Sequence, residues 1–490
     1  MAIFPNAHNF TVNNGSFTIM SNNFHAGHGM QEEQGYAGLK ILYKNTVQGA
    51  FYNSEQRFPP PNCHPGTRTQ VLGIMRSWIT DVADSTSIYW LYGAAGVGKS
   101  AVAQTISEEF AASHLAATFF FARADPSRNN LTSFFITISY QLATSPTLGP
   151  LLKYPIDLAV CENPSIIHAT LEEQFRDLIV LPCNWLAACG LTERWKSLPR
   201  LIVIDGLDEC IDIPSQERLL SIIRKAKNAT PPLPFKFLIC SRPEPRIRNA
   251  FSHRAFHRIL DCTDIGESFE SSKDIAEFFR NGFDKIRRKH GRSMVHVAEN
   301  WPGNGIIQQL VQKACGQFIY ANTVLKYVGD HDGFPVEQLE IILKITVPDN
   351  FQSPYPDLDL LYMQILSVCT QRELLLDVMA HILTADTFLD KRYEETSAFV
   401  IEGVFSLAKG KLWSLLSRLH SVLLIPDNDH SNITVRHASF IDFLTDQKRS
   451  GRYFINTGKE AQHERVLFYL LKMIISSSTV NNLRKYNFEW

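Results

Sequence analysis

Between residues 88 and 262, short apolar runs alternate with stretches of helical spacing. The apolar runs are SIYWLYG, ATFFFAR, LIVIDGL, FKFLICS and HRILDC, and polar helical segments separate them. Strands that alternate with helices are typical of a parallel sheet with helices on both faces. We therefore expect an α/β domain over 88–264. A mostly helical stretch at about 145–196 lengthens one connection, and we interpret it as an insertion.

The pattern changes in front of this domain. Residues 1–57 are rich in Asn, Gly and Ser, and FTVNNGSFTIM surrounds an Asn-Gly turn signal. This segment predicts a small hairpin or a poorly ordered arm. The Pro-rich stretch FPPPNCHPG then begins an extended linker, and TRTQVLGIMRSWITDV has the apolar spacing of a helix. We assign the range 58–87 to this linker and leading helix.

Helical patterns dominate the rest of the chain. Residues 265–349 contain only helical stretches and predict a helical domain. Within 350–455, the segment WSLLSRLHSVLLIPDNDHSNITVRHASFIDFLTD has the order helix, strand, loop, strand, helix, which favours a winged-helix domain. A helical tail is expected over 456–490. No repeat of about 20 to 50 residues is present, so the chain contains no predicted solenoid or propeller.

The composition limits the possible binding partners and the cellular location of the protein. The 490 residues carry 48 basic and 49 acidic side chains, and a net charge of −1 provides no electrostatic basis for binding nucleic acid or an anionic membrane. The nine cysteines lack paired C-x-x-C spacing, and we interpret them as reduced thiols. The first residues do not resemble a secretory signal, and no apolar run reaches about 18 residues. We expect a cytoplasmic protein.

One motif has a specific chemistry. The sequence from Gly93 to Ser100, GAAGVGKS, fits the phosphate-binding loop G-x-x-x-x-G-K-[ST] between an apolar strand and a helix. In such a loop, backbone N–H groups and the helix N-terminus surround the phosphates. Lys99 should reach the β- and γ-phosphates, and Ser100 should bind Mg²⁺. The residues expected to contact the nucleotide are Gly93, Ala94, Ala95, Gly96, Val97, Gly98, Lys99, Ser100 and Ala101.

Two further strands end in polar side chains. The run LIVIDGLDE places Asp205 at the end of a buried strand, where it should bind Mg²⁺ directly or through water. Asp208 and Glu209 follow, and we expect them to orient or deprotonate the attacking water. The strand FKFLICS ends before Arg242, whose guanidinium is a candidate sensor of the γ-phosphate.

The trio GAAGVGKS, LIVIDGLDE and LICSRPE, in this order, resembles the NACHT domain of the signal-transducing ATPases with numerous domains (STAND). It closely resembles the versions common in fungi and is also similar to the P-loop domain of nephrocystin-like proteins. The resemblance implies a switch with a closed ADP state, exchange to ATP, opening, and self-association through the NACHT domain. It also implies that the winged helix closes over the nucleotide.

The resemblance suggests further contacts. In relatives, the histidine of a Met-His-Asp motif after the winged-helix hairpin touches the β-phosphate of ADP, and His437 occupies that place between Arg436 and Ala438. The turn Gly316-Gln-Phe318 corresponds to a Gly-x-Pro turn beside the adenine, with Phe in place of Pro. Residues 64–68 lie on the linker that passes the adenine in relatives.

The leading hypothesis is therefore a nucleotide-dependent switch with slow hydrolysis of ATP to ADP. A metabolic or remodelling P-loop ATPase or kinase is one alternative, and a non-hydrolysing scaffold that keeps nucleotide for stability is another. The Asn-Lys-x-Asp loop of small GTPases is absent, which favours ATP, although the resemblance leaves GTP open. Neither the effector nor the sensor partners can be read from the residues.

Overall fold

The structure is a computed structural model that describes most of residues 36–458. The described residues are 36–81, 86–123, 125–190, 195, 197–266, 271–331, 333–348, 351–384, 396–458, 460, 461, 464 and 467. The predicted hairpin around the Asn-Gly turn, and most of the predicted C-terminal tail, lie outside them. Among the described residues, no helix combines the length and apolar character needed to cross a membrane.

All five apolar runs form strands of one parallel sheet. The strands are β1 (Ile88–Tyr92), β2 (Leu115–Phe120), β3 (Leu201–Asp205), β4 (Lys236–Ser241) and β5 (Leu260–Asp264). Their order is β2-β3-β4-β1-β5, so β4 lies between β1 and β3. Tyr92 pairs with Ser241 and Asp205 pairs with Cys240, which brings the carboxyl ends of β1, β3 and β4 to one edge. The predicted α/β P-loop fold is confirmed.

Helices cover both faces of the sheet, and strand side chains alternate between the two cores. Val203 and Leu238 pack with α2 (Thr69–Thr80) and α3 (Lys99–Glu109) on one face. Ile202, Ile204 and Phe237 face the other core. The elements of that second face are α1 (Ala37–Asn45), α4 (Phe134–Thr144), α5 (Gly149–Glu162), α6 (Leu171–Phe175), α7 (Leu181–Ala188), α8 (Ile213–Lys227) and α9 (Pro245–Phe251).

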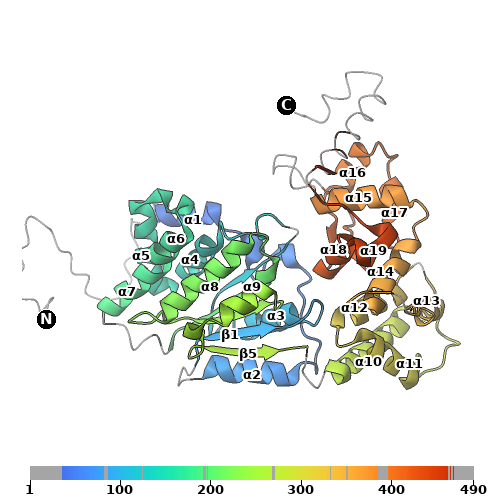
Figure 1. The fold of residues 1–490 in the computed structure, drawn as a ribbon, viewed down its shortest axis with the longest axis horizontal. Helices are drawn as coiled ribbons and strands as arrows, with labels where there is room; N and C mark the ends of the chain where they lie inside the picture. The colour runs from blue at the N-terminus through green and yellow to red at the C-terminus, as the bar shows by residue number, and fades with distance from the viewer. Residues whose placement is uncertain are drawn as a thin grey trace, which may run out of the picture.

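The described part of the N-terminal range differs from the predicted separate arm. Residues 37–45 form helix α1, which packs against α5 and contributes Leu39 and Leu42 to the core of the α/β domain. The backbone N–H of Leu39 donates to Asp157 of α5 at 2.9 Å. The sequence pattern placed a boundary after residue 57, whereas burial of an apolar helix face joins this segment to the domain. Figure 1 shows α1 beside α4 and α5.

The C-terminal region, residues 271–458, is built from helices and one short hairpin. A single apolar core runs from Ile275 to Ile455, so the two predicted units share one core. Figure 1 shows α12 and α18 on the side of this region that faces the α/β domain. The elements are α10 (Ser271–Lys289), α11 (Asn304–Ala314), α12 (Phe318–Val328), α13 (Pro335–Leu343), α14 (Pro356–Ser367), α15 (Arg372–Thr384), α16 (Ala398–Val404), α17 (Lys411–Leu416), β6 (Leu423–Leu424), β7 (Thr434–Val435), α18 (Ala438–Leu444) and α19 (Gln447–Ser450).

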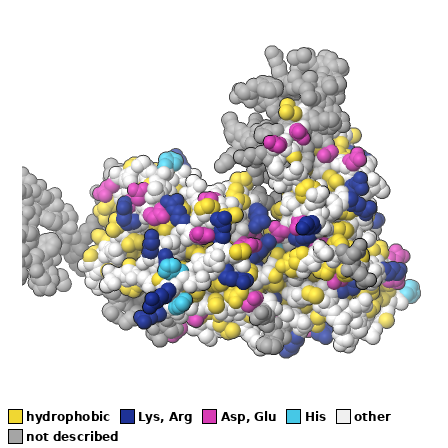
Figure 2. Space-filling model, viewed as in Figure 1, with side chains coloured by type: hydrophobic (Ala, Val, Ile, Leu, Met, Phe, Trp, Pro, Cys, Tyr) yellow, Lys and Arg dark blue, Asp and Glu magenta, His cyan; other side chains and the backbone are white. Residues whose placement is uncertain are grey.

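The hairpin of β6 and β7 is antiparallel and lies between α17 and α18, in the element order that the sequence indicates. Assignment of these elements to a winged helix stays a prediction. On the face drawn in Figure 2, basic and acidic side chains are interspersed over both parts of the molecule, in keeping with the near-zero net charge.

Candidate functional site

The loop between β1 and α3 has a backbone shape that depends on glycine. Gly96 and Gly98 have φ values of +77° and +98°, in the left-handed region that L side chains rarely adopt. A Cβ on Gly96 would lie 2.1 Å from Cγ2 of Ile319, at the start of α12. The backbone N–H of Ile319 also donates to the Gly96 carbonyl at 3.1 Å. The C-terminal region therefore touches the P-loop directly.

Lys99 begins α3, and its side chain folds back over the loop. Its Nζ donates to the carbonyls of Gly93 at 2.9 Å and Ala94 at 2.8 Å. Burial lowers the pKa of Lys99, while the nearby carboxylates of Asp208 and Asp205 oppose that change. An ammonium group held only by carbonyl oxygens at a ring of backbone amides is suited to an anionic ligand.

Asp205 is the acid best placed for a divalent cation. It is 4% exposed at the end of β3, and its Oδ1 has no hydrogen-bond partner. Burial raises its pKa to about 6, although a hydrogen bond from Ser100 and the charge of Arg57 lower it. An unpartnered buried carboxylate oxygen beside a serine hydroxyl matches the hard oxygen donors that Mg²⁺ prefers. These two residues therefore fit a magnesium ion.

Asp208 and Glu209 lie in the short 3-10 turn Leu207–Glu209 that follows β3. Asp208 Oδ1 accepts the backbone N–H of Arg242 at 2.9 Å, and Glu209 Oε2 accepts that of Arg123 at 3.0 Å. Burial and the charge of Asp208 raise the pKa of Glu209 to about 7. A carboxyl group with a pKa near neutrality can accept a proton from water and release it again.

Arg242 is already engaged by two carboxylates. Its Nε lies 3.1 Å from Asp208 Oδ2, and its Nη1 lies 2.7 Å from Oδ2 of Asp442 on α18. Burial would lower the pKa of Arg242, but these carboxylates more than offset it and raise the pKa. Asp442 also pairs with Arg123, whose Nη1 lies 3.0 Å from Oδ1. Sequence reasoning found Arg242 but missed Arg123 and Asp442, because no motif includes them.

His437 caps the N-terminus of α18 and lines the same cavity as the P-loop. Its Nδ1 accepts the backbone N–H of Ser439 at 3.1 Å, which assigns the ring proton of the neutral form to Nε2. Burial, together with the charges of Arg242, Lys99 and Lys326, lowers the pKa of His437 to about 3. The imidazole is therefore neutral at physiological pH, and Nε2–H is a potential donor to a phosphate.

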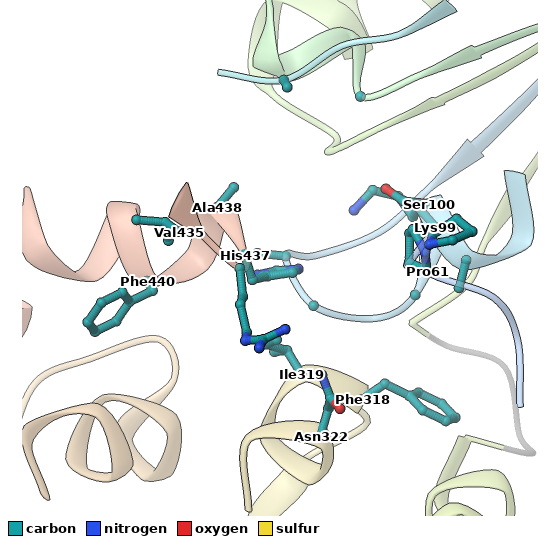
Figure 3. Close-up of a pocket in the computed structure, with 18 of the residues that line it drawn as sticks. Pro61, Lys99, Ser100, Phe318, Ile319, Asn322, Val435, His437, Ala438 and Phe440 are labelled. Carbon is teal, nitrogen blue, oxygen red and sulfur yellow. The ribbon is translucent and has the colours of Figure 1, made fainter. Parts of the chain in front are cut away.

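A single cavity of about 620 Å³ joins these residues. Figure 3 shows Lys99 and Ser100, Ile319 of α12 and His437 on different walls of it. Eight lysine and arginine residues line the cavity but only three acidic ones, a balance that favours a polyanion. The volume lies in the usual range of ligand pockets.

The two segments that the resemblance assigns to the nucleotide base also line this cavity. The ring of His64 meets Phe278 edge-on, with centroids 5.5 Å apart. The guanidinium of Arg68 lies 4.8 Å from the centroid of Phe318. The structure thus brings the linker and the Gly316 turn together as an aromatic wall, although the two are far apart in sequence.

A comparison with protein families identifies the first part of this site. Residues 67–242 match the family described as nephrocystin 3, N-terminal. These residues resemble a nephrocystin-like P-loop NTPase domain. The match spans the P-loop, Asp205, strand β4 and Arg242 directly after it, and it covers just over a third of the chain. The backbone geometry of the loop between β1 and α3 agrees with a nucleotide-binding P-loop in such a domain.

Searches of other proteins add little to this assignment. No curated protein matches the chain. A Walker-type ATPase of Pyrococcus abyssi is 13% identical over 78% of this chain and 97% of the ATPase, with a TM-score of 0.34. A chain from the structure of Drosophila ORC bound to AT-rich DNA and Cdc6 is 11% identical over 95% of this chain and 71% of its own length, with a TM-score of 0.24. Because both TM-scores are low, the assignment of the P-loop domain depends on the family match and the geometry of the site.

Proposed function

We propose that this protein is a nucleotide-dependent switch of the NACHT and STAND type. In this proposal it binds ATP and ADP with Mg²⁺, hydrolyses ATP slowly, and self-associates according to the nucleotide bound. One observation carries the proposal: the phosphate-binding loop and His437 of the C-terminal region line one cavity. A nucleotide there would contact both parts of the molecule at once.

A ligand shifts a conformational equilibrium only as far as it binds the two states unequally. Closed and open arrangements would differ in the contacts that α12 and α18 add to the cavity. Ile319 touches Gly96, and Asp442 pairs with Arg242, so a change in the phosphates acts on groups that join the two parts. This supports a role in which nucleotide state, rather than a released product, is the output.

Ser100 and Asp205 would hold the magnesium ion, which neutralises phosphate charge when bound. Lys99 would leave its two carbonyl partners to bind the phosphates. Glu209, with its pKa of about 7, would accept a proton from the attacking water, and Asp208 would keep Arg242 in place. The partial protonation of Glu209 favours slow turnover.

The test is to identify the nucleotide released when the purified protein is denatured, and then to measure its mass in solution. We expect bound ADP, and a larger assembly with a non-hydrolysable ATP analogue than with ADP. Lys99→Ala should carry no nucleotide and should not change its mass. A monomer in both nucleotide states would refute the switch, and rapid steady-state turnover with a small acceptor would favour a kinase instead.

A further inference from the structure

Two arginines of the α/β domain share one carboxylate from the C-terminal region. Arg123 follows β2 and Arg242 follows β4, the two strands that flank β3 in the sheet. Their Nη1 atoms lie 3.0 Å and 2.7 Å from the two carboxylate oxygens of Asp442. Two guanidinium groups around one anion form a strong site for either carboxylate or phosphate. We call Arg123 and Arg242 the arginine pair.

The α/β domain positions the arginine pair by itself. Arg123 donates through Nη2 to the carbonyl of Asp208 at 3.1 Å, and through its backbone N–H to Glu209. Arg242 binds Asp208 through its backbone N–H at 2.9 Å and its Nε at 3.1 Å. All these partners belong to the turn after β3, so the pair does not need Asp442 to keep its place.

Asp442, in contrast, reaches the arginine pair only through the packing of α18. His437 caps this helix, and Ser439 Oγ lies 2.8 Å from the hydroxyl of Tyr362 on α14. The carboxylate is therefore positioned by the C-terminal region and not by the α/β domain. It occupies an anion site beside Asp208 and Glu209, where the expected hydrolysis would take place.

The position of the arginine pair relative to the P-loop indicates which anion it would accept. A P-loop holds the α- and β-phosphates in its backbone cradle. A third phosphate extends beyond this cradle, and both arginines line the same cavity as Lys99 of the P-loop. A diphosphate would end at the cradle and leave Asp442 in place.

We propose that the terminal phosphate of a nucleoside triphosphate binds the arginine pair and displaces Asp442. Arg123 is then a phosphate-binding residue in addition to Arg242, and Asp442 is a carboxylate that discriminates against triphosphate. This inference rests on the proposed nucleotide-binding function.

The experiment compares the affinities of wild type and Asp442→Asn for ADP and for a non-hydrolysable ATP analogue, by calorimetry in the presence of Mg²⁺. Asparagine keeps the size of the side chain but gives up the charge that competes with phosphate. We expect Asp442→Asn to raise the affinity for the triphosphate by about tenfold and to leave the affinity for ADP almost unchanged. Asp446→Asn is the matched control, because Asp446 caps α19, asparagine caps equally well, and no contact with the arginine pair involves it.

The double variant Asp442→Asn/Arg123→Gln isolates the contribution of Arg123, because the competing carboxylate is already neutral. It should lose the tenfold gain. The inference is overturned if wild type binds ADP but the ratio of the two affinities is the same in wild type and Asp442→Asn. A wild type that binds neither nucleotide would instead overturn the proposed function, and this inference with it. Thermal melting of each variant checks that it is folded. The ratio of the ADP and triphosphate affinities is also measured in the double variant, as a second test.

Discussion

A buried ion pair between α14 and α19 should make a large contribution to the free energy of unfolding of the C-terminal region. Asp359 is fully buried, and its two oxygens accept Nη2 and Nε of Arg449 at 2.7 Å and 3.0 Å. The side chain of Arg449 is only 9% exposed. Asp359→Asn keeps the shape but leaves the guanidinium buried without its counter-charge. Removal of one partner from a buried pair costs about 3–5 kcal/mol.

Amide hydrogen exchange measures this loss locally, which matters in a protein with more than one folded part. A loss of about 3 kcal/mol corresponds to more than a hundredfold faster exchange, since each 1.4 kcal/mol is tenfold. We expect this acceleration in α14 and α18, whereas β1 and β3 provide an internal reference. Glu340→Gln is the matched control, because its pair with Lys344 is exposed and should contribute under about 1 kcal/mol.

Two outcomes would refute the reasoning. Exchange in α14 that rises less than about threefold in Asp359→Asn would show that the pair does not stabilise the region. The double variant Asp359→Leu/Arg449→Met should recover most of the loss, because replacement of both charges by apolar groups is often neutral. A double variant as unstable as the single one would show that packing, rather than charge, is responsible.

Three further predictions concern the nucleotide. Lys99→Ala should abolish nucleotide binding, and unchanged ADP retention after purification would contradict the site. Asp208→Asn or Glu209→Gln should slow hydrolysis and prolong the ATP state in a phosphate-release assay, whereas the exposed Glu217→Gln should not; wild-type turnover in both would remove the water-positioning role. The pKa of Asp205 is raised to about 6, so the carboxyl is protonated at lower pH and must lose a proton to bind metal. Magnesium-dependent affinity should therefore rise from about pH 5 to pH 7, and Asp205→Asn should remove this dependence; a flat wild-type profile would argue against Asp205 as ligand.

Local sequence patterns were sufficient for the elements of the phosphate site. The octapeptide from Gly93 to Ser100 contains the residues that its turn requires, because Gly96 and Gly98 adopt left-handed backbone conformations that other residues rarely adopt. Strands β1 to β4 are largely apolar runs, since both faces of the sheet are buried there. The acid-tipped strand and the strand before Arg242 were also visible, because each polar side chain directly follows its strand.

Other features had no local signal. Nothing in residues 36–57 indicates that α1 packs on α5, because an amphipathic helix does not specify which surface covers it. Asp442 is an ordinary acid on a short helix, and Arg123 follows a strand that contains no motif residue. The two are 319 positions apart, and no spacing rule joins them.

The sequence by itself therefore determined the phosphate loop, the five strands and the acids at their ends, because each depends on consecutive residues and short-range backbone sterics. Tertiary structure alone decided that β4 lies between β1 and β3, which places Arg242 against Asp208. It also decided that α18 brings Asp442 and His437 to the same cavity. These contacts arise from the packing of the apolar cores, which brings together charged residues that are far apart in the sequence.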